Sequence, residues 1–77
     1  PQVVINVKDV AKEKLEGNSA IISAVQKYES ELKGSGRVLL RASGTEALVR
    51  VMVEASTDTL ASSVANDLAE VVKKELG

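Results

Sequence analysis

The chain has 77 residues, of which 44% are hydrophobic and 27% charged, with a formal net charge of -1 at pH 7 and neither cysteine nor histidine. This length predicts a single domain, residues 1–77, built around one core. The composition excludes disulfides, thiolate chemistry and the commonest zinc ligand. The interspersed charges argue against a general polyanion-binding protein, which would need a basic face.

The first part of the chain predicts a strand followed by a helix. Val3–Val7 is apolar with alternating faces, which is typical of a strand. The charged stretch Asp9–Glu16 predicts a short helical turn that ends at Gly17. Asn18 or Ser19 is suited to cap the next helix, since either side chain can accept a hydrogen bond from its first turn. That helix carries one apolar stripe at helical spacing: Ile21, Ile22, Val25, Tyr28 and Leu32.

The middle of the chain predicts two strands joined by a short loop. Gly34–Gly36 ends the helix, and Arg37–Arg41 forms a strand with Val38, Leu39 and Leu40 at its centre. Leu48–Glu54 forms another strand, because it is rich in β-branched residues. The loop between them, Ala42–Ala47, is short enough to make the two strands antiparallel neighbours.

The last part of the chain predicts a second helix. Thr57 or Asp58 can cap its start, and Lys73 and Lys74 fall in its last turn, where cations oppose the helix dipole. Its apolar residues recur every three or four positions: Leu60, Val64, Leu68, Val71 or Val72, and Leu76.

The order strand, helix, strand, strand, helix predicts an α+β two-layer sandwich. We expect a small, mostly antiparallel sheet of about three strands with both helices on one face, in an undetermined strand order. No apolar run approaches the ~20 residues needed to span a bilayer, and nothing at the start resembles a secretory signal. We therefore expect a cytoplasmic protein with no membrane partner.

The loop after the second strand carries the groups that suit a phosphate monoester. Arginine offers a permanently charged, planar fork that matches two phosphate oxygens. Serine and threonine add hydroxyls, and a glycine lets the ligand approach the backbone amide. The candidate phosphate-binding residues are Arg41, Ser43, Gly44, Thr45 and Arg50. A hairpin brings the two arginines near each other, whereas Glu46 is expected to pair with an arginine or with a hydroxyl of the substrate.

Structural interpretations of the same residues remain open. Ser-Gly-Thr is common in turns, and arginines at strand ends are usually solvated. The pairs Lys12/Lys14 and Lys73/Lys74 have the pattern of ordinary solvated helix faces. Tyr28, on an apolar stripe, is predicted to lie in the core.

The segment from Arg41 to Glu54 resembles the C-terminal phosphate-binding loop of the α-D-phosphohexomutases. The family pattern is Arg-x-Ser-Gly/Asn-Thr-Glu-Pro with a further arginine soon after. Residues 1–7 and 36–40 also resemble the last domain of these enzymes, so the resemblance spans most of the chain. Gly44, in place of asparagine, and the flanking strands favour the branch that acts on glucosamine phosphate. Ala47 departs from the pattern, since the family usually has proline there.

The resemblance implies a role within a four-domain enzyme, of which this chain would be the fourth domain. Such an enzyme interconverts glucosamine 6-phosphate and glucosamine 1-phosphate, a step toward cell-wall precursors, using a phosphoserine and Mg²⁺ held by other domains. The implied partners of this chain are the phosphosugar and the other domains. Its five candidate residues would hold the phosphate that is not transferred, and alone it would bind no metal and catalyse nothing.

Two other readings compete with this one. The chain could come from a mutase of the same family that acts on mannose or glucose phosphates, because the loop recognises phosphate more than sugar. Small α+β sandwiches also serve as RNA- or protein-binding modules. The RNA reading is the weaker, since the predicted strands lack the aromatic residues on which bases stack.

Overall fold

The computed structural model describes residues 1–32 and 34–77 and has three strands and two α-helices in the described part. In chain order the elements are β1 (Gln2–Lys8), the 3-10 helix η1 (Lys12–Lys14), α1 (Ser19–Leu32), β2 (Arg37–Ala42), β3 (Leu48–Glu54) and α2 (Asp58–Leu76). This is the predicted order of elements, and the boundaries agree with the predicted ones to within a few residues.

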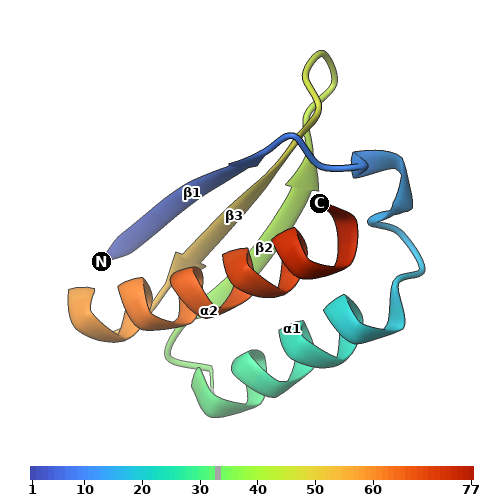
Figure 1. Cartoon of the computed structure of the whole chain (residues 1–77). Coiled ribbons are helices and arrows are strands. Elements are labelled where there is room, and N and C mark those ends of the chain that lie inside the picture. Colours follow the sequence, from blue (N-terminus) through green and yellow to red (C-terminus); the bar gives the residue numbers. More distant parts are fainter. Residues whose placement is uncertain (33) are drawn as a thin grey trace.

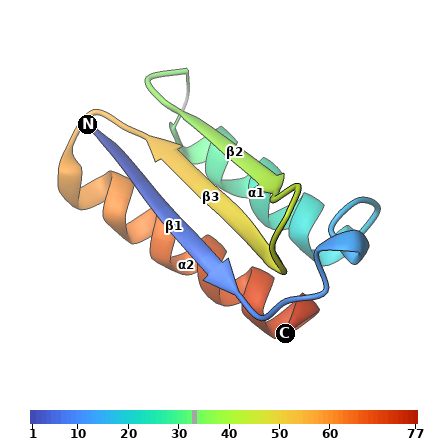
Figure 2. The same ribbon diagram turned by 90° about the horizontal axis from the view of Figure 1, so that it is seen from above.

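The three strands form one antiparallel sheet in the order β1-β3-β2. The last strand in the sequence, β3, therefore lies at the centre, where it pairs along its length with both neighbours (Figure 2). This central position explains why β3 is rich in apolar residues. Helices cover one face of the strand, and a neighbouring strand lies on each side of it. The sequence leaves this order undetermined, since no local pattern distinguishes a central strand from an edge strand in so short a sheet.

Both helices pack on the same face of the sheet, which confirms the predicted α+β sandwich (Figures 1 and 2). The helix α2 lies against β1 and β3, and α1 lies against β2 and α2. Val49, Val51 and Val53 of β3 point toward the helices and have no exposed surface. The intervening residues of all three strands point to the opposite face, here called the open face, which carries Asn6, Arg41 and Arg50 among others.

Side-chain caps begin both helices. The Asn18 Oδ1 atom accepts a hydrogen bond from the Ile21 amide at 3.0 Å, and the Thr57 Oγ1 atom accepts one from the Leu60 amide at 3.1 Å. Each cap satisfies an amide that has no partner within the helix. The predicted caps are therefore confirmed, with Asn18 and Thr57 as the residues chosen from each predicted pair.

Tyr28 joins the two helices rather than lying wholly within the core. Its ring packs against the core, and its hydroxyl donates a hydrogen bond of 2.9 Å to the Asp67 carboxylate on α2. This hydrogen bond, with a smaller effect of burial, raises the pKa of the Tyr28 hydroxyl above its ordinary value. The predicted core position is thus only partly correct, because the hydroxyl reaches the surface.

Two apolar residues of the predicted elements are exposed. Ile22 is 45% exposed and does not join the buried stripe, because a helix turns each residue about 100° from the previous one and Ile21 takes the inward direction. Leu39 is 44% exposed because it lies on the open face, whereas its neighbour Val38 faces the helices and is buried. The sequence placed Ile22 on the apolar stripe of its helix and Leu39 at the centre of its strand, but the faces of the elements decide their burial.

The other differences concern the ends of elements. The predicted helical turn over Asp9–Glu16 is reduced to the three residues of η1. Val10, just before it, is buried, so this segment bends over the core instead of coiling in solvent. Ala42, assigned to the loop by sequence, pairs with Val49 and belongs to β2. The hairpin loop is therefore Ser43–Ala47, and it extends from the end of the sheet near η1 (Figure 1).

Candidate functional site

Arg41 and Arg50 lie directly opposite each other in the antiparallel pair β2–β3. Opposite residues in such a pair project from the same face, so both guanidinium groups belong to the open face. The predicted proximity of the two arginines is therefore confirmed, while their binding role stays a prediction. On the other side of Arg50 in the sheet lies Asn6 of β1.

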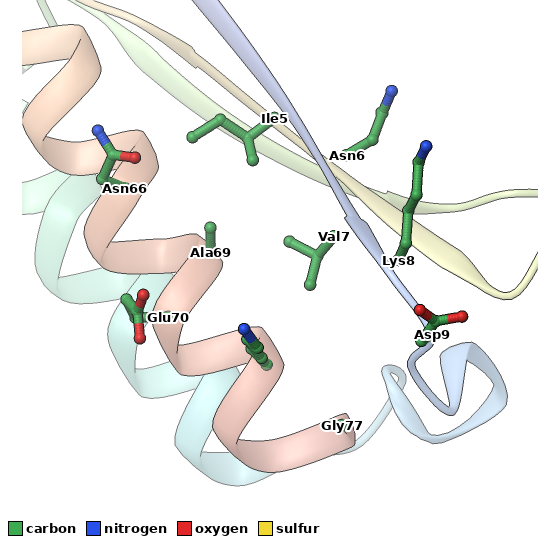
Figure 3. Close-up of a pocket in the computed structure, with 10 residues that line it drawn as sticks. Ile5, Asn6, Val7, Lys8, Asp9, Asn66, Ala69, Glu70 and Gly77 are labelled. Atoms are coloured by element: carbon green, nitrogen blue, oxygen red, sulfur yellow. The ribbon is translucent and has the colours of Figure 1, made fainter.

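Asn6 orients the side chain of Arg50. The Arg50 Nε–H group donates a hydrogen bond of 3.2 Å to the Asn6 Oδ1 atom. Figure 3 shows Asn6 pointing away from α2, while Ile5 and Val7 point toward it. This contact uses the Nε–H donor of the guanidinium and leaves its two terminal nitrogens for another partner.

Neither arginine of this pair is neutralised by a carboxylate within the described residues. The ion pair in that part of the chain joins the Arg37 Nε atom to the Glu54 Oε1 atom at 2.8 Å, at the far end of the sheet. Glu46 is exposed and forms no ion pair with either arginine there, which leaves its predicted contact with a substrate hydroxyl untested. Two like charges face each other without a counter-charge, and this arrangement favours an anion.

Ser43 organises the hairpin loop. Its Oγ atom accepts hydrogen bonds from the amides of Thr45 at 3.3 Å and Glu46 at 3.2 Å, and its own amide donates to the Leu48 carbonyl at 3.0 Å. The hydroxyl proton of Ser43 is not used by these contacts. In residues 1–32 and 34–77, the Gly44 amide and the Thr45 hydroxyl form no hydrogen bond with the protein. The loop therefore presents three small donors to a ligand.

A pocket of about 270 Å³ lies where the loop meets the two arginines. Its lining residues are Arg41, Ala42, Ser43, Gly44, Leu48 and Arg50. The structure thus brings four of the five predicted residues around one hollow. Thr45 lies on the adjoining turn of the loop, outside the lining.

The segment that follows β1 contacts both ends of the hairpin loop, which the sequence did not predict. The Lys12 Nζ atom donates a hydrogen bond to the Ser43 carbonyl, and the Val10 amide donates one of 3.2 Å to the Ala47 carbonyl. The prediction that Lys12 is an ordinary solvated lysine is therefore wrong, since it is half-buried and bonded to a residue 31 positions away. Only tertiary structure reveals this contact, because Lys12 and Lys14 are alike in local sequence.

A larger pocket of about 670 Å³ lies between β1 and α2 (Figure 3). Apolar side chains from β1 form part of it, and it carries charges of both signs, from Lys8, Asp9, Glu70 and Lys73. None of the five predicted residues lines this pocket. Its balanced charges offer a phosphate no net attraction, in contrast to the smaller pocket beside the arginines.

The described residues offer neither a metal-binding cluster nor a membrane-spanning helix. In residues 1–32 and 34–77, no group of three or more acidic side chains is placed to hold a metal ion. Neither α-helix of that part of the chain is long and apolar enough to cross a membrane. The pocket beside Arg41 and Arg50 is therefore the site that combines fixed charge, small donors and an accessible hollow.

Comparisons with known proteins show the family to which the chain belongs. Residues 4–71 match the family model described as phosphoglucomutase/phosphomannomutase, C-terminal domain. The chain is 55% identical over 76 residues to phosphoglucosamine mutase of Parafrankia sp. and 56% identical over 77 residues to that of Streptomyces griseus. These alignments cover 99% and 100% of this chain but 16% and 17% of the two relatives.

Solved structures of mutases share the fold of this chain. N-acetylphosphoglucosamine mutase of Aspergillus fumigatus, in complex with GlcNAc-6P and magnesium, matches 96% of this chain at a TM-score of 0.79 and 30% identity. A variant of that enzyme in complex with glucose 1,6-bisphosphate matches 97% at a TM-score of 0.81. In both cases the match covers 15% of the larger chain. This chain therefore belongs to the phosphoglucomutase/phosphomannomutase C-terminal domain family, the last domain of the phosphohexomutases.

Proposed function

We propose that this chain is the substrate-phosphate-binding domain of a phosphoglucosamine mutase, an enzyme that interconverts glucosamine 6-phosphate and glucosamine 1-phosphate. The domain binds and orients the phosphate that is not being transferred. Arg41 and Arg50 supply two charged forks, and Ser43, Gly44 and Thr45 supply hydroxyl and amide donors. The other steps of the reaction belong to other domains of the parent enzyme, since this chain spans about one sixth of its curated relatives.

The observation that carries the proposal is the facing pair of arginines on the open face. Arg41 lies directly opposite Arg50, both line the same pocket, and neither has a carboxylate partner within the described residues. A phosphate dianion placed there gains two charge-assisted contacts and relieves the repulsion between the two guanidinium groups. The small donors at the start of the loop match the remaining phosphate oxygens.

The chemical step needs groups that this chain does not offer. Phosphoryl transfer requires a nucleophile or donor, a metal that spreads the charge, and an aligned acceptor. A solved relative contains magnesium, but the described residues include no acidic cluster that fits such an ion. We therefore place the Mg²⁺ ligands and the phosphoserine on other domains, and we expect the isolated chain to be catalytically inactive.

The contribution of this domain to the reaction is positional. Holding a phosphate far from the reacting atoms converts remote binding energy into alignment of the reacting end. A single phosphate held from one side stays largely hydrated, so we expect the isolated domain to bind with a Kd of about 1 mM, or about 4 kcal/mol. Closure by the other domains would exclude water and strengthen the same contacts.

The assignment to glucosamine phosphate rests on the relatives rather than on the loop. Curated relatives at 55% and 56% identity are phosphoglucosamine mutases, and one solved neighbour is in complex with GlcNAc-6P. The polar groups of the pocket are guanidinium, hydroxyl and amide donors that suit phosphate, so it distinguishes poorly between hexoses. Activity of the parent enzyme on glucosamine phosphate, compared with mannose and glucose phosphates, tests this part of the proposal.

A titration of the 77-residue protein followed by amide chemical shifts tests the binding role. Glucosamine 6-phosphate and inorganic phosphate are expected to shift the amides from Arg41 to Arg50, whereas glucosamine, which lacks the phosphate, leaves them unchanged. Shifts that spread over the open face on addition of a short RNA would instead favour an RNA-binding module. Absence of any response to sugar phosphate and inorganic phosphate at concentrations well above 1 mM would overturn the proposal.

A further inference from the structure

We propose that Lys12 is a positioning residue of the phosphate site, which it supports by fixing the backbone of the hairpin loop. The inference rests on the proposed function, since it concerns the same site. Lys12 lies outside the pocket lining and does not belong to the loop. Its effect on a ligand is therefore indirect, through the residue it contacts.

The contact of Lys12 falls on the residue that organises the loop. Its ammonium group donates to the carbonyl of Ser43, whose hydroxyl accepts the amides of Thr45 and Glu46. The Ser43 amide is also bonded, to the Leu48 carbonyl. With both backbone groups and the hydroxyl oxygen engaged, Ser43 has one donor left, its hydroxyl proton, and its position is determined from three sides.

A second contact from the same segment holds the other end of the loop. The amide of Val10, two residues before Lys12, donates to the carbonyl of Ala47. Val10 is anchored because its side chain is buried, and the Ala11 amide donates to the Leu76 carbonyl at 2.8 Å. The segment is thus packed in the core through Val10 and hydrogen-bonded to α2 and to both ends of the loop. Figures 1 and 2 show η1 and the loop at the same end of the sheet.

This arrangement matters because the loop is exposed and has few apolar contacts of its own. Gly44, Thr45, Glu46 and Ala47 are all exposed. If binding must order a flexible loop, the entropy lost by the loop weakens the affinity for the ligand. A loop that is already held in place does not incur this loss. The Lys12–Ser43 contact is part-buried, so it is less screened by water than a surface contact. We infer that Lys12 lowers the Kd for phosphate by keeping the loop ordered before phosphate arrives.

The matched comparison is between Lys12→Met and Lys14→Met in the 77-residue protein. Both substitutions remove one positive charge from η1 and keep most of the side chain, but Lys14 is exposed and forms no hydrogen bond with the loop in the described residues. Lys12→Met is expected to raise the Kd for inorganic phosphate about threefold, the effect of one lost hydrogen bond. Lys14→Met should change it less than about 1.5-fold at physiological salt. Lys12→Arg keeps a charged donor and should restore binding.

A second measurement, made without phosphate, separates this inference from the proposed function. The ¹⁵N order parameters of Gly44, Thr45 and Glu46 should fall toward about 0.6 in Lys12→Met and stay near those of the parent in Lys14→Met. Lys12→Gln provides the same test should Lys12→Met unfold the domain. If the parent protein does not bind phosphate, the proposed function fails, and the order parameters still decide whether Lys12 holds the loop. Equal order parameters in both lysine variants would overturn the inference, even if the two differed in Kd.

Discussion

Arg41 and Arg50 face each other across the β2–β3 ladder, with Asn6 on the far side of Arg50, so one row of the open face holds two cations and one amide. A row of this kind is unfavourable for the folded state, because like charges directly opposite in a sheet repel each other. Proteins often retain such unfavourable arrangements where a ligand relieves them. The row therefore links the stability of the domain to the presence of an anion.

The repulsion between the arginines predicts that Arg41→Gln stabilises the free domain. Removing one of two facing cations should raise the free energy of unfolding by about 0.2–0.5 kcal/mol in phosphate-free, low-salt buffer. Urea unfolding measures the change. The control is Arg37→Gln, on the same strand and face, which breaks the ion pair with Glu54 and should give no gain. A loss of stability in Arg41→Gln would show that the two guanidinium groups do not repel each other as argued.

The contact between Asn6 and Arg50 predicts a gain in stability at the cost of binding. Asn6→Asp places a carboxylate 3.2 Å or so from the Arg50 Nε atom, in the position of the present amide oxygen. The new ion pair should stabilise the free domain by about 0.2–1 kcal/mol and raise the Kd for phosphate at least about threefold, because it competes with the ligand for Arg50. Unfolding and phosphate titration measure the two effects.

Gln2→Glu is the control for Asn6→Asp. It adds the same charge to β1 on the same face, but opposite Glu54 at the other end of the strand. Phosphate binding should change little in this variant, since screening weakens the effect of a distant charge. An equal loss of phosphate affinity in both variants would mean that net charge, rather than competition for Arg50, controls binding.

The geometry of the loop exit predicts that Ala47→Pro stabilises the domain. The Leu48 amide donates to the Glu46 carbonyl at 2.8 Å, so Ala47 is the central residue of a three-residue turn, and its φ is not positive. An inverse turn of this type has φ near the value that proline imposes. The Ala47 amide forms no hydrogen bond in the described residues, so its loss costs little. Thermal unfolding should show a gain of about 0.4–1 kcal/mol.

Glu46→Pro tests the same reasoning from the opposite side. The Glu46 amide donates to the Ser43 Oγ atom, and proline cannot make this hydrogen bond. This variant should be less stable than the parent, although it lies one residue away in the same loop. If both proline variants lowered the melting temperature, the assignment of the turn at Ala47 would be wrong.

The Tyr28–Asp67 hydrogen bond predicts a loss of stability at alkaline pH. The pKa of Tyr28 is raised in the folded protein, first of all by its hydrogen bond to the Asp67 carboxylate. The stabilisation is therefore complete below the ordinary tyrosine pKa of about 10 and is lost as the pH rises through the higher pKa of the folded state. Urea unfolding of the parent and of Tyr28→Phe, compared from neutral pH to above about pH 11, isolates this contribution, because the variant lacks only the titrating hydroxyl. A pH-independent difference between the two proteins would contradict it.

Much of this fold follows from local pattern. The apolar alternation of β1 and β3 and the helical spacing of the stripe on α2 give the element order, and Asn18 and Thr57 mark the helix starts through an interaction that is local in sequence. The candidate phosphate-binding loop can also be recognised from sequence, because charge, hydroxyls and glycine occur together within a few residues. The hairpin then brings Arg41 opposite Arg50 without any information from the rest of the chain.

The remaining features depend on contacts between distant segments. The central position of β3 in the sheet is decided by how the whole chain packs, and it cannot be inferred from the length or composition of this strand. The roles of Asn6 and Lys12 arise because β1 and η1 pass beside Arg50 and Ser43, which lie 44 and 31 residues away in sequence. Nothing local separates Lys12 from Lys14, so a sequence pattern assigns both to solvent.

Titration of inorganic phosphate into Arg41→Ala and Arg37→Ala, beside the parent protein, tests the phosphate-binding role of this domain most directly. Both substitutions remove one arginine from β2 on the open face, but Arg41 lines the pocket and Arg37 pairs with Glu54. We expect Arg41→Ala to raise the Kd about tenfold, the effect of losing one charged fork, and Arg37→Ala to leave it within about a factor of two. Equal Kd values for the parent and Arg41→Ala would contradict the proposed function.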